Sequence, residues 1–338
     1  MGPRHGHRRA GRGLHEVALT NEFDLIARYF SRPAPATYLG VGDDCALMPS
    51  VPGMQLATST DLLIEGRHFF SDAEPRSLGH KALAVNLSDL AAMGATPAAC
   101  LLGLSLPELR PDWLEAFADG FYALADAAGC PLVGGDTTRS PAGIVISVTV
   151  LGHVPAGKAL RRDAARQGDD IWVSGSLGAA DIALRLLTGE LPPDPALLAA
   201  TRAALEHPEP PLALGAALAG VAHAALDISD GLLQDLGHIL QASACGARLE
   251  YPALPVAAAL AALPAAQQLR AVLGGGDVYQ LCFTAAAARR EQVLALARSC
   301  GTRVSRVGRI TARQDGLQVL DAAGRPLDAL PSGFDHFS

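Results

Sequence analysis

The sequence lacks several patterns that would assign a protein to a class at once. Its six cysteines form no C-x-x-C pair, which disfavours a zinc site or a disulfide framework and favours free thiols in a reducing cytoplasm. The longest apolar stretch, residues 90–106, is interrupted by Gly94 and Pro97, so we expect no membrane span. Residues 1–17 are basic and glycine-rich but have no apolar core, so we expect a disordered tail rather than a secretory signal.

Charge is also scarce. Charged residues make up 18% of the 338 residues and hydrophobic residues 49%, a composition that indicates a globular protein. The formal net charge is -7 and no basic stripe runs through the part expected to fold, so nucleic acid is not an expected partner. An anionic small ligand remains compatible with this charge, because metal ions can bridge acid to acid. The length exceeds what one core usually supports, so we expect two domains.

The common nucleotide-binding loops are missing. The P-loop pattern fails because Gly157-Lys158 is followed by Ala159, and "GVGDD" has Cys45 where G-x-G-x-x-G needs its last glycine. The protein-kinase signatures are absent as well. A bound nucleotide would therefore need other turns, and "VGGD" and "LGGGD" are candidates because glycine lets the backbone approach phosphate closely.

The apolar periodicity predicts two halves with a boundary near residue 155. Residues 18–154 follow an α+β order, and residues 155–338 read as an α/β domain after a connection at 155–168. The expected strands are 54–61, 97–107, 131–136, 143–152, 169–175, 224–229, 278–284, 302–310 and 316–320. The expected helices are 20–30, 75–93, 111–128, 177–187, 211–219, 230–242 and 285–297.

Carboxylates recur where an apolar segment meets a turn or a helix start. The residues concerned are Asp43, Asp44, Ser59, Thr60, Asp61, Asp89, Asp136, Asp227 and Asp230. Ligands bind at strand ends in open sheets, and acids that converge there repel one another unless cations lie between them. Carboxylate and hydroxyl oxygens suit Mg²⁺, which is typically shared with substrate phosphates. The set therefore predicts an acid-rich site that holds a nucleotide through several Mg²⁺ ions.

Each acid also has a purely structural explanation. Asp61 could end a strand, Asp136 could shape a turn after two glycines, and Asp230 or Ser229 could cap a helix. Asp89 resists this explanation, because its neighbours in the expected helix are apolar. Taken together, five such positions in one chain favour the metal site. His68, in contrast, reads on spacing alone as a surface histidine.

Six blocks carry a family pattern in order along the chain: "GVGDDCAL", "STDLLIEGRHF", "HKALAVNLSDLAAMGATP", "LVGGDTTR", "ALDISDGLLQDLGHI" and "GGGDVYQLCF". Together they resemble the thiamine-monophosphate kinase family, part of the aminoimidazole-ribonucleotide synthetase superfamily, over about residues 22–337. The resemblance implies an N-terminal α+β domain that binds ATP and Mg²⁺ and forms a barrel across a homodimer. An α/β C-terminal domain would cover the site. The implied reaction converts ATP and thiamine monophosphate into ADP and thiamine diphosphate.

The resemblance also implies roles for single positions. Implied metal ligands are Asp44, Ser59, Thr60, Asp61, Asp89, Asp136, Asp227 and Asp230. Asp44, Asp61, Asp89 and Asp227 among them would carry catalysis, since phosphoryl transfer depends mainly on positioning and charge neutralisation. Implied ATP contacts are Gly135, Asp136, Arg162 and Ser229. Implied contacts to the thiamine phosphate are His68, Asp277 and Phe334.

One departure weakens the pattern at the substrate contact. Asp277 and Val278 stand where the family has glutamate and aspartate, and the shorter carboxylate of Asp277 reaches less far. Two alternatives remain open. One is another ATP-dependent superfamily enzyme, either a ligase-like cyclase or a selenophosphate-forming enzyme. The latter commonly needs a reactive cysteine or selenocysteine near the N-terminus within a glycine-rich loop, and none stands before Cys45. The other is a non-catalytic ATP- and Mg²⁺-binding homologue, which the full set of matched acids disfavours.

Overall fold

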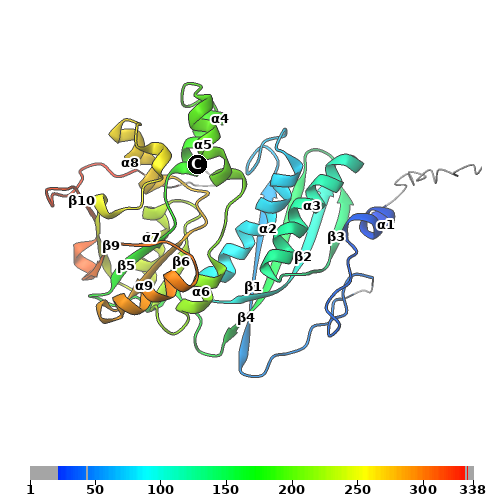
Figure 1. The fold of residues 1–338 in the computed structure, drawn as a ribbon, viewed down its shortest axis with the longest axis horizontal. Helices are drawn as coiled ribbons and strands as arrows, with labels where there is room; N and C mark the ends of the chain where they lie inside the picture. The colour runs from blue at the N-terminus through cyan, green and yellow to red at the C-terminus, as the bar shows by residue number, and fades with distance from the viewer. Residues whose placement is uncertain (1–21, 43–44, 332, 334–338) are drawn as a thin grey trace, which may run out of the picture.

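Two β-sheets stand side by side and organise the molecule (Figure 1). The computed structural model describes residues 22–42, 45–331 and 333. Most of the expected helices and strands are confirmed, with ends that shift by a few residues. In the described part of the expected helix 20–30, α1 (Glu22–Leu25) is followed by a π-turn at Ile26–Phe30. No helix within the described residues is both long enough and apolar enough to cross a membrane.

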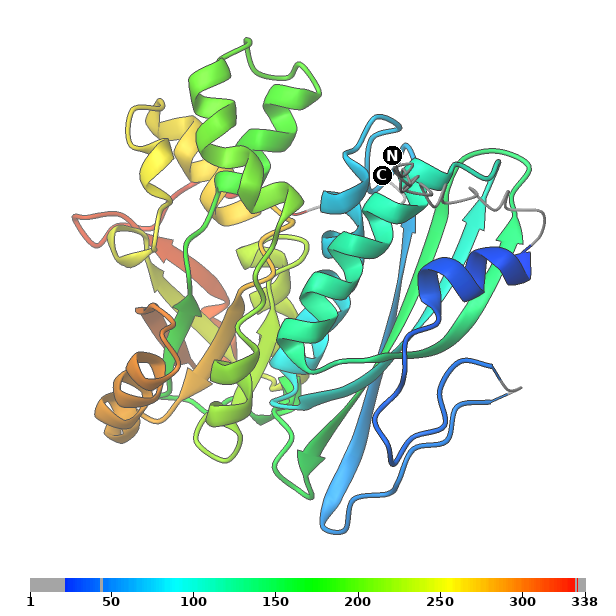
Figure 2. The same cartoon turned by 45° about the vertical axis from the view of Figure 1, so that its right-hand side comes forward.

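The first sheet has four strands in the order β1-β4-β2-β3. Their bounds are β1 (Met54–Ile64), β2 (Thr96–Leu106), β3 (Leu132–Arg139) and β4 (Val145–Pro155). The β2–β3 pair is parallel, and the other two pairs are antiparallel. Helices α2 (Pro75–Ala92) and α3 (Pro111–Ala128) both cover one face of this sheet (Figure 2). The side chains that alternate onto this face form the first hydrophobic core.

Helix α2 is buried almost all round. The Glu74 carboxylate caps its start by accepting from the backbone nitrogens of Arg76 and Ser77, at 3.1 and 2.7 Å. From Ser77 to Ala92 every side chain is buried or half-buried. Its neighbours are the first sheet, helix α3 and the second half of the chain, so α2 forms the layer between the two halves.

Two glycines let α2 and α3 approach closely. A Cβ atom on Gly79 would lie 2.1 Å from the carbonyl oxygen of Phe117, and one on Gly120 would lie 1.8 Å from that of Arg76. Only residues without a side chain fit at these two points, since real Cβ contacts are never so short. The position of α2, and of every functional group on it, therefore depends on this backbone contact.

The second sheet has six strands in the order β10-β7-β9-β5-β8-β6. Their bounds are β5 (Asp170–Ser174), β6 (Ala224–Asp227), β7 (Gly246–Glu250), β8 (Leu281–Ala285), β9 (Val304–Thr311) and β10 (Leu317–Leu320). The helices of this half are α4 (Ala179–Leu187), α5 (Pro195–Glu206), α6 (Leu212–Leu218), α7 (Leu232–Ala242), α8 (Ala265–Gly274) and α9 (Arg290–Ser299). Strand β7 and helices α5 and α8 are additions to the elements expected from the sequence.

A separate hydrophobic cluster joins the halves. Ala91 and Ala92 at the end of α2 pack with Leu214 and Leu218 of α6 and with Trp172 of β5. Burying these side chains stabilises the fold by roughly 25 cal/mol for each Å² of apolar surface removed from water. The contact fixes the carboxyl end of α2 against the second half, next to the site described below.

Candidate functional site

Carboxylates from three separate elements meet where the two halves face each other. Alternation along β1 puts Ser59 and Asp61 on the face toward α2, where the Ser59 hydroxyl donates to Oδ2 of Asp89 at 2.5 Å. The backbone nitrogen of Asp61 donates to Oδ1 of Asn86 at 2.9 Å. Asp227, the last residue of β6, accepts from the Ser88 hydroxyl at 2.8 Å. The structure thus brings Ser59, Asp61, Asp89 and Asp227 together, as the metal hypothesis expects.

Burial and neighbouring charge raise the pKa values in this cluster. Burial, and then the charge of Asp89, raises the pKa of Asp61 to about 6 and that of Asp227 to about 7. Burial raises the pKa of Asp89 itself, although its hydrogen bond from Ser59 and the charge of Arg162 act in the opposite direction. The fully ionised cluster is therefore electrostatically costly on its own. A cation at this point would remove that cost.

The donor set suits Mg²⁺ better than a soft metal. Among the residues that the structure describes, no three His, Cys, Asp or Glu side chains converge closely enough to hold an ion by themselves. Mg²⁺ is usually held in just this incomplete way, by one or two carboxylates, waters and substrate phosphates. The oxygens of Asp61, Asp89 and Asp227 therefore fit Mg²⁺ ions that are shared with a phosphate ligand.

A second group of acids lies at the turn that follows β6. Oδ2 of Asp235 accepts from the backbone nitrogens of Asp230 and Gly231, at 3.0 Å each, and so holds the turn before α7. Burial and the charge of Asp230 raise the pKa of Asp235 to about 7. The Asp230 carboxylate accepts from the Gln234 amide at 3.3 Å. Asp235 was missed in the sequence, although its place in the first helical turn is a recognisable signal for such a role.

The glycine-rich turn after α8 packs against this same turn. The Asp277 backbone nitrogen donates to the Ser229 carbonyl oxygen at 2.8 Å. The Asp277 side chain pairs with Lys81 of α2, with 2.7 Å between Nζ and Oδ1, and accepts from the Tyr279 hydroxyl at 3.2 Å. Burial and the charge of Asp277 raise the pKa of Tyr279 well above its usual value. Lys81 and Tyr279 were also missed; the signal for Lys81 is a lysine inside the apolar run "HKALAV".

The positions of two further expected residues, Arg162 and His68, are also defined. Arg162 stands in a short 3₁₀ turn, Arg162–Ala164, close enough to Asp89 for its charge to oppose the rise in the pKa of Asp89. Its backbone carbonyl accepts from the Ser243 hydroxyl at 2.8 Å. His68 is half-buried, and its Nδ1 accepts from the backbone nitrogen of Ile64 at 3.0 Å.

Other expected residues lie elsewhere or cannot be placed. The Thr60 hydroxyl points to the opposite face of the first sheet, where it contacts the Thr149 hydroxyl at 2.5 Å. Gly135 and Asp136 are exposed on β3. Asp136 lies beside Gly103 of β2 in the strand register, on the same face of the sheet as the Thr60 hydroxyl. The structure therefore does not bring the Thr60 or Asp136 side chains to the cluster. Asp43, Asp44 and Phe334 lie outside the described residues.

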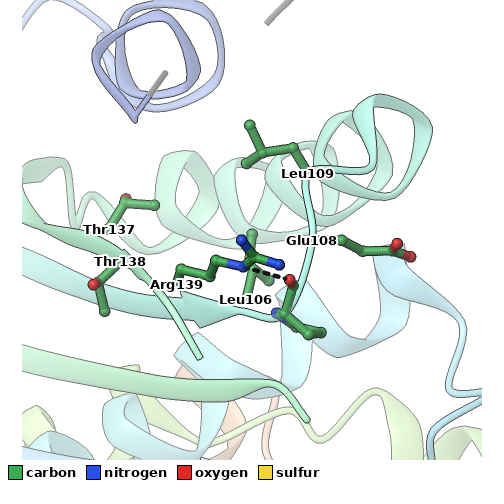
Figure 3. A pocket seen from close by; sticks show the side chains of 7 residues that line it. Leu106, Glu108, Leu109, Thr137, Thr138 and Arg139 are labelled. Atoms are coloured by element: carbon green, nitrogen blue, oxygen red, sulfur yellow. Dashed lines mark hydrogen bonds between the residues drawn. The ribbon is translucent and has the colours of Figure 1, made fainter. Parts of the chain in front are cut away.

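A pocket of about 410 Å³ opens at the ends of β2 and β3 (Figure 3). Its lining consists of Leu106, Pro107, Glu108, Leu109, Thr137, Thr138 and Arg139. Nε of Arg139 donates to the Pro107 carbonyl oxygen at 3.2 Å across it. None of these residues belongs to the carboxylate cluster, so this pocket is separate from the acidic site.

Comparison with known proteins gives consistent matches along the chain. The profile described as AIR synthase related protein, N-terminal domain, matches residues 42–154, and the corresponding C-terminal domain profile matches residues 166–319. Thiamine-monophosphate kinase of Salmonella typhimurium is 42% identical over 325 residues, which cover 94% of this chain and 98% of that protein.

Solved structures agree with the sequence relatives. The crystal structure of thiamine-monophosphate kinase from Stenotrophomonas maltophilia K279a has a TM-score of 0.79 and 47% identity, with 88% of this chain and 94% of that chain covered. A second structure, described as AaThiL complexed with AMPPCP and TMP, has a TM-score of 0.73 and 30% identity, with 86% and 89% covered.

Proposed function

Since the chain belongs to the thiamine-monophosphate kinase family of AIR synthase-related proteins, we propose that it transfers a phosphoryl group from ATP to thiamine monophosphate. The products would be thiamine diphosphate and ADP. The observation that carries this proposal is the meeting of Asp61, Asp89 and Asp227 from three elements between the two halves. A relative with the same fold is described in complex with AMPPCP and TMP, an ATP analogue and the acceptor.

The residues act chiefly by position and charge. Asp61, Asp89, Asp227 and Ser59 would hold Mg²⁺, which when bound supplies charge neutralisation at the transferring phosphates. Arg162 and Ser229 would contact ATP, and His68 and Asp277 the acceptor. The attacking group is a phosphate oxygen that is already ionised at neutral pH, so no strong general base is needed.

ADP release tests the activity directly. We expect turnover with ATP, Mg²⁺ and thiamine monophosphate, and none with thiamine or aminoimidazole precursors as the acceptor. Turnover only with an aminoimidazole precursor would instead assign the chain to another superfamily reaction. Binding of ATP and Mg²⁺ by calorimetry without any ADP release would indicate a non-catalytic homologue.

Mg²⁺ should stabilise the protein more at pH 8 than at pH 5.5. Asp61 and Asp227 have folded-state pKa values of about 6 and about 7, above the ordinary value of 3.8, so the folded state binds more protons in this range. The stability that these two groups contribute to the metal-free chain therefore falls as the pH rises from about 4 to 7. Mg²⁺ replaces those protons, and a hundredfold excess over Kd contributes about 2.7 kcal/mol.

Thermal unfolding with Mg²⁺ or EDTA at both pH values measures this difference. Sodium chloride at matched ionic strength controls for general salt effects. An equal Mg²⁺-dependent rise in Tm at the two pH values would argue against ion binding at these carboxylates.

We also propose a homodimer formed through the free face of the first sheet. Leu56, Leu62 and Ile64 of β1 are 56, 54 and 42% exposed and lie on the face opposite α2 and α3. Such an apolar sheet face usually marks a protein–protein contact. A second copy of the chain offers a matching surface through two-fold symmetry.

Leu62→Asp should convert the dimer to a monomer, because it places a charge in the middle of that face. Sedimentation of the wild type and the variant at micromolar concentration measures the change. Leu109→Asp is the matched control, since Leu109 is 43% exposed but lies outside this face. A monomeric wild type, or a dimeric Leu62 variant, would rule out this interface.

We propose further that the two halves are separate domains, residues 18–154 and 155–338. The tail expected at residues 1–17 lies outside the described residues. Strand β4 ends at Pro155, and the first sheet takes all its strands from before that point. The two family profiles also leave residues 155–165 between them.

A cytoplasmic location is the last part of this proposal. All six cysteines are free, and Cys45 among them is exposed. Exposed free thiols persist in reducing compartments.

A further inference from the structure

Helix α2 presents a polar stripe to the second half of the chain. One side of the helix carries Ser77, His80, Lys81 and Ser88. The last three follow Ser77 by three, four and eleven residues, which are positions on one helix face. Ser77 Oγ lies 2.9 Å from Nε2 of His207, and Nε2 of His80 lies 2.9 Å from the Pro208 carbonyl oxygen. Ser88 contacts Asp227, as described above. Lys81 stands in the middle of this stripe.

Lys81 is a buried cation whose ionic partner among the described residues is Asp277. The residue is 7% exposed, and its ammonium group lies 2.7 Å from Oδ1 of Asp277, whose side chain is 29% exposed. The Tyr279 hydroxyl donates to the same oxygen, while Oδ2 accepts no hydrogen bond from the residues that the structure describes. The carboxylate is thus held through one oxygen, and the other is left for a ligand.

The backbone that carries Asp277 needs such a support. Asp277 and Tyr279 have φ values of 57° and 51°, in the left-handed region that side chains disfavour. The preceding turn has no spare room, because a Cβ on Gly276 would lie 2.6 Å from the Ser229 carbonyl oxygen. The segment is therefore fixed by its surroundings. From the first half, Lys81 supplies an ionic contact to Asp277, and the first core packs against Tyr279.

Charge gives Lys81 a second role. The Tyr279 hydroxyl is within electrostatic reach of Asp277, Asp227 and Asp61, so Asp277 adds to the negative charge of the site. A negative Asp277 without a cation would repel a phosphate ester that binds beside it. The pair with Lys81 leaves the carboxylate as a hydrogen-bond acceptor with little net charge.

We propose that Lys81 is a positioning residue for the acceptor substrate, which fixes Asp277 across the boundary between the halves and neutralises its charge toward the phosphate. The inference rests on the proposed kinase function. It predicts that replacing Lys81 raises the KM for thiamine monophosphate because the Asp277 carboxylate then has no cation beside it. Replacing Asp277 as well should then lower this KM again. If Lys81 served only the fold, the second substitution would not lower the KM.

Three variants test this prediction: Lys81→Met, Asp277→Asn and the double variant. Lys81→Met should raise the KM for thiamine monophosphate about tenfold or more and leave the KM for ATP within twofold. The double variant should return to the KM of Asp277→Asn alone. Arg76→Met is the matched control, since Arg76 lies on the same helix but forms an exposed ion pair with Asp119.

The outcomes separate this role from the proposed function. Absence of wild-type turnover with thiamine monophosphate would contradict the function itself. Two results would contradict only the role of Lys81, provided that the wild type turns over. One is an unchanged KM for thiamine monophosphate in Lys81→Met, and the other is a double variant whose KM rises by the product of the two single effects. Should Lys81→Met fail to fold, Lys81→Gln gives the same comparison, with thermal unfolding of all variants as the check on folding.

Discussion

Asp89→Asn is expected to lower turnover by at least about a hundredfold while leaving the free energy of unfolding unchanged or higher. Losing one electrostatic contact to a transition state typically costs 10²–10³ in rate, and Asp89 is the acid whose charge raises the pKa of both Asp61 and Asp227. The neutral amide can still accept the hydrogen bond from Ser59. It also removes one charge from a repulsive cluster, which relieves the folded state.

Steady-state kinetics and denaturant unfolding of the same preparation measure the two effects separately. Asp119→Asn serves as the control, because Asp119 is an exposed acid of α3 that forms a surface ion pair with Arg76. A variant of Asp89 that keeps its rate but melts much earlier would mean that this carboxylate serves the fold rather than the reaction.

Gly120→Ala should destabilise the protein by about 3 kcal/mol or more. The new Cβ would lie 1.8 Å from the Arg76 carbonyl oxygen, and a backbone oxygen in a capped helix start cannot move aside as a side chain can. Overpacking of this kind typically costs about 1–3 kcal/mol, and more when the backbone must shift. Turnover should fall as well, since any displacement of α2 moves Ser88 and Asp89.

Gly237→Ala is the matched control for this substitution. Gly237 lies inside α7, where an added Cβ meets no atom within 4 Å. Alanine there should stabilise the chain by about 0.5–1 kcal/mol, because it restricts the unfolded backbone and favours the helix. Equal losses at the two glycines would show that the contact between α2 and α3 is looser than the structure indicates.

Helix boundaries were predictable from the sequence where the chain carries clear stop signals. Helix α3 matches the expected range because Pro111 begins it and Gly129 ends it with φ of 62°. Helix α5 was missed, since "PALLAATRAALE" has alanine on every side and so no contrast between faces. Strand β7 was missed because its sequence, GARLE, has no apolar run and only two apolar side chains, Ala247 and Leu249, which are separated by the charged Arg248.

The acids of the site were predictable because each stands at a local break in the apolar pattern. Their partners were not, because Lys81 meets Asp277, and Ser88 meets Asp227, only after the two halves have packed together. Thr60 could have been separated from Ser59 and Asp61 in advance, because neighbouring residues of a strand point to opposite faces. The role of Asp44 stays a prediction.

Few positions of helix α2 can be substituted without disturbing its packing. An ordinary surface helix has a solvent side on which one residue can replace another at little cost, but α2 is enclosed from Ser77 to Ala92. One side fits α3, another fits the first sheet, and the third carries the contacts to the second half. A substitution there disturbs packing even where it touches no ligand, so in a random mutant library the block "HKALAVNLSDLAA" should be among the least tolerant of change.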